Sequence, residues 1–119
     1  MDQRLYNLKK LEEIAYGDDE FIRDMVVTFI ENVTTDLGII LSFRSVDNWK
    51  GVAETAHKLA SNFAYLCADE LHDLSAKIEK KVLNDNDLTG IAEKTDLLCQ
   101  KGFSMVDQVK NDFFMQDTN

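Results

Sequence analysis

Apolar residues recur every three to four positions along most of this chain, which is the spacing of amphipathic helices. The first stripe is short and predicts a helix capped by Asn7; its apolar positions are Leu8, Leu11, Ile14 and Ala15. Asp18 or Asp19 is expected to cap a long second helix over residues 21–43. Its apolar positions are Phe21, Met25, Phe29, Val33, Leu37 and Ile40. Gly38 lies inside this helix, where it costs about 1 kcal/mol relative to Ala and favours a bend or an early end.

The middle of the chain carries a third stripe, which predicts another helix. Its apolar arc consists of Val52, Ala56, Leu59, Ala60, Phe63, Leu66 and Cys67. Asp47 is the expected N-cap, and Val46 before it is placed to pack against Gly51 or Val52. Successive residues of a helix are turned by about 100°, so His57 lies roughly 120° from the centre of this arc. We therefore expect His57 on the surface of the protein.

Two more helices are predicted in the last part of the chain. Asp69 is expected to cap the first of them, whose apolar positions are Leu71, Leu74, Ile78 and Val82. A turn follows at residues 84–87, and the final stripe comprises Leu88, Ile91, Thr95, Leu98, Cys99, Val106, Val109 and Phe113. Short connections make neighbouring helices antiparallel. The pattern therefore predicts an all-α fold, an antiparallel up-down-up-down four-helix bundle with a short extra N-terminal helix, in a single domain over residues 1–119.

The composition fits this interpretation and narrows the choice of partners. Of the 119 residues, 45% are hydrophobic and none is proline, which suits long helices. The net charge of −9 argues against binding to nucleic acid or to an anionic membrane, because both are negatively charged. The first residues lead into no signal-peptide pattern, and no stretch is expected to reach the roughly 20 apolar residues that span a bilayer. We expect a soluble, cytoplasmic and free-standing monomer.

The surroundings of His57 are unusual for a surface histidine. Its helical neighbours, three, four and seven positions away, are Lys50, Ala53, Glu54, Ala60, Ser61 and Ala64. Four of these six are Ala or Ser, so another protein could approach the imidazole closely. Spacing alone nevertheless favours an incidental surface histidine, because nothing nearby in the sequence orients the ring.

A longer pattern around this histidine changes that balance. The segments that carry it are Asp47-Asn48-Trp49-Lys50, Ala56-His57-Lys58-Leu59 and Leu66-Cys67-Ala68-Asp69-Glu70-Leu71. They resemble the signature of histidine-containing phosphotransfer (HPt) domains, which typically reads Asp-Trp, then Ala-His-x-Leu-Lys-Gly-Ser, then Leu-Gly-Ala. The resemblance extends in helix order from about Leu8 to Val109. It implies a helical bundle whose histidine carries a phosphoryl group.

Three positions depart from the family pattern. The lysine expected three residues after the histidine is Ala60, the next glycine is Ser61, and a later glycine is Cys67. Ser61 is small enough to allow close approach, but the loss of the lysine removes a cation that could steady a phosphoryl group. Lys50, two turns back on the same side, is the better substitute; Lys58 projects about 100° away from His57.

The resemblance implies a phosphorelay intermediate in two-component signal transduction. It would accept a phosphoryl group on His57, as phosphohistidine, and exchange it with the aspartate of a response-regulator receiver domain, alone or within a hybrid histidine kinase. The receiver would supply Mg²⁺, and this chain would need no cofactor of its own. The expected docking residues are Lys50, Ala53, Glu54, Lys58, Ala60, Ser61 and Ala64.

Alternative chemistries find little support in the sequence. Glu54-x-x-His57 and Asp69-x-x-His72 have the spacing of a di-iron motif, but such ligands must project into the bundle, whereas Glu54 and His57 are predicted to face water. No nucleotide-binding loop is present, so we expect a phosphocarrier and not an enzyme. Cys67 and Cys99 are expected to be small buried thiols. A non-catalytic interaction module that has lost phosphotransfer remains the alternative function.

Overall fold

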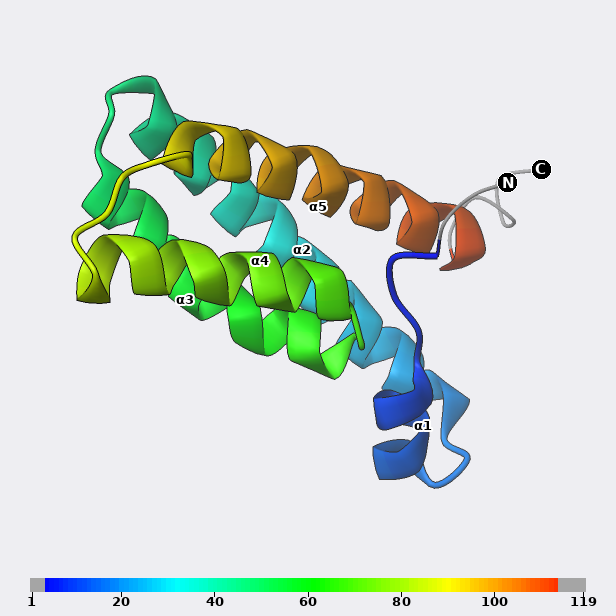
Figure 1. Ribbon diagram of the computed structural model, residues 1–119. Coiled ribbons are helices and arrows are strands. Elements are labelled where there is room, and N and C mark those ends of the chain that lie inside the picture. The colour runs from blue at the N-terminus through cyan, green and yellow to red at the C-terminus, as the bar shows by residue number, and fades with distance from the viewer. Residues whose placement is uncertain (1–3, 114–119) are drawn as a thin grey trace.

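Helices account for nearly all of the chain that the computed structural model describes, residues 4–113 (Figure 1). The elements are α1 (Lys9–Ala15), α2 (Asp19–Ser45), α3 (Trp49–Tyr65), α4 (Asp69–Glu79), a π-helical turn η1 (Lys80–Asn84) and α5 (Ile91–Phe113). No strand occurs within the described residues. The predicted all-α class is therefore confirmed, as is the presence of one short helix ahead of four longer ones.

The four longer helices share one hydrophobic core. Helix α3 packs against both α2 and α4, and α5 packs against α2 and α4 on the other side. Figure 1 shows α3 and α4 side by side, α5 on the opposite side of the bundle from α3, and α1 beyond one end of the bundle. The predicted stripes supply the core, whose largest fully buried side chains include Leu11, Leu37, Ile40, Leu59, Phe63, Leu66, Leu71, Ile78, Leu98 and Met105.

The connection between α2 and α3 differs from the prediction by one residue. Asn48, not Asp47, is the N-cap of α3, because its side chain accepts a hydrogen bond from the Gly51 N–H at 2.9 Å. Asp47 instead has a left-handed backbone (φ 56°), which Asp tolerates better than most residues. The predicted packing of Val46 against Gly51 or Val52 is also wrong, since Val46 is 72% exposed. At the start of α2 the prediction holds: Asp18 accepts from the Phe21 N–H at 3.0 Å.

At the corner between α3 and α4, one departure from the family pattern places a side chain where the backbone is left-handed. Cys67 follows the end of α3 with a φ of 51°, a left-handed conformation that favours glycine. The position where the family has glycine is thus one where a side chain causes backbone strain. Ala68, not Asp69, is the N-cap of α4, and it makes no side-chain cap bond. The predicted N-cap is therefore wrong by one residue, because Asp69 is the first residue of the helix.

The end of α4 extends further than predicted. The chain continues from α4 into η1 as far as Asn84, so the turn begins later than the polar run suggests. Ion pairs hold this segment, with Lys80 Nζ 2.9 Å from Asp85 and Lys81 Nζ 2.9 Å from Asp87. The prediction that Leu88 belongs to the final stripe is wrong, because it lies before α5 and is largely exposed.

Two helical glycines have opposite surroundings. A methyl group built on Gly38 would meet no atom within 4 Å, and α2 continues through this residue without ending. The same group on Gly102 would come within 2.8 Å of Leu37 Cδ1 in the core. Gly102 is therefore a point at which α5 and α2 approach closely.

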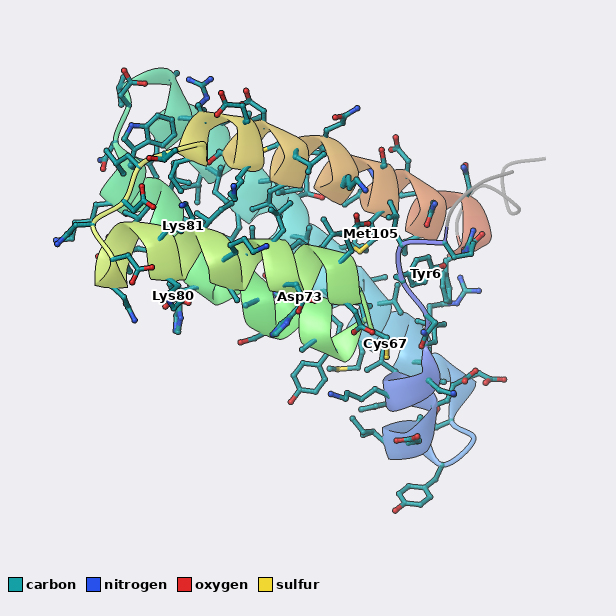
Figure 2. All side chains as sticks on the ribbon, viewed as in Figure 1. Tyr6, Cys67, Asp73, Lys80, Lys81 and Met105 are labelled. Atoms are coloured by element: carbon teal, nitrogen blue, oxygen red, sulfur yellow. The ribbon has the colours of Figure 1, made fainter. Side chains whose placement is uncertain are left out.

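The segment before α1 ties the two ends of the described chain together. The Asn7 N–H donates to the Leu66 carbonyl at 2.9 Å, and the carboxylate of Asp112 accepts from Arg4 and from the Tyr6 hydroxyl. Leu8 holds the N-cap position of α1 without a side-chain bond, whereas the Asn7 side chain accepts from the Lys9 N–H at 3.0 Å, so the predicted cap acts from one residue earlier. Burial and the bond to Asp112 raise the pKa of Tyr6, and the bonds from Tyr6 and Arg4 lower the pKa of Asp112. Figure 2 shows Tyr6 and Cys67 at the same end of the bundle.

Helix α2 corrects one expectation about membranes. By length and composition alone it could cross a bilayer, so the prediction that no stretch reaches this limit is wrong. In the bundle α2 contacts α1, α3 and α5, and its buried side includes the charged residue Asp36. Core helices meet the same length and composition test.

Candidate functional site

His57 lies in the middle of α3 and points away from the core. Its side chain is 69% exposed, whereas Ala56 and Leu59 on either side of the pair His57-Lys58 are fully buried. The helical wheel thus predicted its orientation correctly. The ring stands on a rigid helix, because α3 is packed on two sides by α2 and α4.

A carboxylate from α4 holds one edge of the imidazole. Glu79 Oε2 lies 2.7 Å from Nδ1 of His57. The two atoms are within ion-pair distance, and the nearby carboxylate favours the tautomer that carries its proton on Nδ1. In the neutral imidazole the other nitrogen, Nε2, then carries the free lone pair.

The sequence interpretation missed Glu79 entirely. The signal that could have found it is the corner between the two helices, because residues at similar distances from the corner of an antiparallel pair lie opposite each other. His57 is ten positions before Cys67, and Glu79 is twelve positions after it. The expectation that nothing nearby orients the His57 ring holds for residues of α3, but it does not hold for Glu79 of α4.

The residue after His57 reaches in the other direction. Lys58 Nζ lies 3.8 Å from Asp36 Oδ1 on α2, and the Asp36 side chain is only 10% exposed. The Lys58 side chain itself is 66% exposed. Two consecutive residues of α3 therefore contact opposite neighbours: His57 contacts α4, and Lys58 contacts α2.

Most of the other expected docking residues lie at the surface. Glu54 and Ser61 are exposed, and Ala60 and Ala64 are half-buried. Ala53 is fully buried in the core, so the expectation that it contributes to the surface is corrected. The accessible residues that follow His57 on its own face of α3, Ala60, Ser61 and Ala64, are short and leave this side of the ring open.

Lys50 lies at the end of α3 that is near η1. It lines a shallow hollow with Trp49, Val82, Leu83, Asn86 and Leu88. Figure 2 shows Lys80 and Lys81 at this same end of α4, away from Cys67. Trp49 is half-buried against the core, and the guanidinium of Arg44 lies 5.5 Å from the centre of its ring.

Other reactive side chains are placed differently. His72 on α4 is half-buried, and its Nδ1 lies 3.4 Å from Asp73 of the same helix. Within residues 4–113 no three His, Cys, Asp or Glu side chains gather where they could hold a metal ion. Burial raises the pKa of the Cys99 thiol to about 11. Cys67 is half-buried, so the expectation that both thiols are buried holds for Cys99 alone.

Comparison with known proteins adds one match. The family described as "Hpt domain" matches residues 24–111, which span α2 to α5 and include His57 and Glu79. No curated protein and no solved structure matches the chain.

Proposed function

This chain belongs to the Hpt domain family, and from that membership we propose that it is a phosphorelay intermediate that carries a phosphoryl group on Nε2 of His57. The observation that carries the proposal is the contact between His57 and Glu79. It occupies Nδ1 and leaves Nε2 as the nucleophile on a side chain that is mostly exposed. Members of this family are phosphocarriers and not kinases.

The transfer step needs little from this chain beyond position and charge. The Nε2 lone pair attacks phosphorus of the receiver's aspartyl phosphate, and the phosphorus–oxygen bond breaks with its electron pair returning to the aspartate carboxylate. The phosphorylated ring keeps its Nδ1 proton and becomes positively charged. Glu79 then faces a cation, and the attraction between the two groups increases.

The proposed partner is a receiver domain, free or within a hybrid kinase, which brings its own Mg²⁺. The surface we assign to it consists of Lys50, Glu54, Lys58, Ala60, Ser61 and Ala64 around His57. Short side chains at positions 60, 61 and 64 support this assignment, because they let a partner's backbone approach the ring. We further propose that the protein acts as a monomer in the cytoplasm, over a single domain.

We also propose that the four longer helices follow each other up and down as an antiparallel bundle. The support is that consecutive long helices pack on each other and that α2, α3 and α4 are joined by connections of only three residues. This arrangement is what brings Glu79 opposite His57.

The direct test uses phosphoramidate, a small-molecule donor that needs no partner. Nε2 attacks its phosphorus and ammonia leaves, so the wild-type protein should gain phosphate that is labile in acid and stable in alkali. His57→Gln should gain none, and His72→Gln should behave as wild type. Phosphate on His57→Gln, or none on the wild type, would contradict the proposal.

Docking is tested separately by adding bulk at Ser61. Ser61→Trp should block phosphate exchange with a receiver domain charged with acetyl phosphate, while labelling by phosphoramidate continues. Ser104→Trp is the control, because Ser104 is an exposed serine on α5, across the bundle from α3. Receiver binding without phosphate exchange in the wild type would favour the non-catalytic module, which the replacements at Ala60 and Ser61 make the second candidate.

A further inference from the structure

The contact to Glu79 fixes where a phosphoryl group on His57 would lie. The two ring nitrogens of an imidazole point away from each other, separated by one carbon. Because Nδ1 is the ring nitrogen beside Glu79 on α4, Nε2 is the nitrogen further from α4. A phosphoryl group on Nε2 therefore lies on the solvent side of α3 that is turned towards α2.

A cation already lies on that side. Lys58 extends from α3 towards α2, where its ammonium is 3.8 Å from the carboxylate of Asp36. This distance is beyond that of a hydrogen bond, so the pair is a loose one. An ammonium group has three donors on a flexible stem, so it can contact a phosphoryl oxygen while it stays close to Asp36.

We propose that Lys58 binds the phosphoryl group of phosphorylated His57 and replaces the lysine that the family pattern has at the position of Ala60. This inference rests on the proposed function. Asp36 serves as the resting counter-ion of Lys58 and keeps its side chain on the flank of α3 to which Nε2 points. The sequence favoured Lys50 for this role because Lys50 shares a face with His57.

The other lysines near the site are placed less well. Lys50 is seven residues before His57, about 10 Å along the helix axis, and lines the hollow beside η1. Lys80 follows Glu79 on the flank opposite to Nε2, and its ammonium is engaged by Asp85 at 2.9 Å. The direction of the ring, and not sequence spacing, therefore selects Lys58.

The test compares four variants in the full-length protein. Lys58→Met removes the cation, Lys58→Arg retains it, and Asp36→Asn breaks the same ion pair from the other side. Lys80→Met is the control for loss of a lysine on the α4 flank. For each variant the rate of labelling by phosphoramidate and the half-life of the phosphohistidine are measured, with the thermal midpoint as a check on folding.

We expect Lys58→Met to slow labelling by about tenfold, which corresponds to the loss of one charge-assisted hydrogen bond in the transition state. Lys58→Arg should recover most of the rate and Lys80→Met should label as wild type, whereas Asp36→Asn should lose less than Lys58→Met, because it removes the positioning carboxylate but keeps the cation. If Lys58 only supported Asp36, Asp36→Asn and Lys58→Met would be equally slow, and this result would overturn the inference.

Wild-type labelling separates this inference from the proposed function. A wild-type protein that takes no phosphate contradicts the phosphorelay role itself. A wild-type protein that labels at the same rate as a folded Lys58→Met variant leaves that role intact and refutes the role of Lys58 alone.

Discussion

Replacing Glu79 by alanine tests whether the carboxylate on α4 decides which ring nitrogen reacts. In the resting protein its oxygen is 2.7 Å from Nδ1 of His57. Without it, neither nitrogen is assigned to a partner on α4, and the ring can turn about its side-chain bonds. We therefore expect Glu79→Ala to label more slowly and to yield some phosphate on Nδ1 as well as on Nε2.

The size of the effect follows from the nature of the contact. An ion pair with an exposed side chain contributes about 0.2–1 kcal/mol in the resting protein, and His57 is 69% exposed. The attraction strengthens as positive charge develops on the ring, so a loss of about 1.5 kcal/mol in the transition state corresponds to roughly a tenfold lower rate. Glu79→Gln keeps an acceptor for the Nδ1 proton but loses the charge, and about a threefold decrease is expected.

The assay is labelling by phosphoramidate, with nuclear magnetic resonance of the phosphorylated ring to identify the nitrogen that carries phosphorus. Glu70→Ala is the control, because Glu70 lies on the same helix but pairs with Lys101, at 2.6 Å, instead of with the histidine. A Glu79→Ala protein that labels at the wild-type rate and only on Nε2 would show that the ring needs no support from α4. Equal slowing in Glu70→Ala would point to general damage of α4.

Three further predictions concern stability. Gly38→Ala should raise the free energy of unfolding by about 1 kcal/mol, since an added methyl group meets open space. Gly102→Ala should lower the free energy of unfolding by roughly 1–3 kcal/mol, because the methyl group would come too close to a core leucine. Urea unfolding measures both changes. Cys67→Gly should add about 1 kcal/mol by relieving the left-handed backbone, seen as a higher thermal midpoint. The hydrogen bond from Tyr6 to Asp112 should stabilise the fold between pH 3.8 and pH 10.0, the ordinary pKa values of the two groups. Its contribution declines as the pH falls through the lowered pKa of Asp112 in the folded protein, and as the pH rises through the raised pKa of Tyr6. Tyr6→Phe should therefore flatten the pH profile of the thermal midpoint.

The fold was largely predictable because apolar residues recur every three to four positions in each helix that forms the core. The stripes of apolar residues gave the number, order and approximate bounds of the helices, and the exposed side of α3 was found from the wheel alone. Errors of a single residue occurred at caps, where neighbouring residues compete for the same role, as Asp47 and Asn48 do. The π-helical turn η1 could not be predicted, since it is defined by backbone hydrogen bonds across five residues, such as the one from the Asp85 N–H to the Lys80 carbonyl at 3.0 Å, which the apolar stripe does not reveal.

The candidate site was predictable only within one helix. Spacing along α3 placed His57 and its short neighbours correctly, but it gave no information about which residues of α2 and α4 lie beside them. Glu79 was missed for that reason, and Ala53 was assigned to the surface although a flanking helix covers its face. The angular distance of Lys58 from His57, which counted against it on the wheel, is what brings it to Asp36.

The two contacts of the pair His57-Lys58 suggest why the chain tolerates alanine at position 60. The α4 flank orients the ring through Glu79, and the α2 flank carries the cation at Lys58. In the roles we propose, these groups act on different atoms of the phosphorylated side chain, Nδ1 and the phosphoryl oxygens. If they act independently, the rate loss in a Glu79→Ala, Lys58→Met double variant should be the product of the two single losses, about a hundredfold. A smaller combined loss would mean that a ring released by Glu79 also moves the phosphoryl group away from Lys58, so that orientation has to precede charge stabilisation.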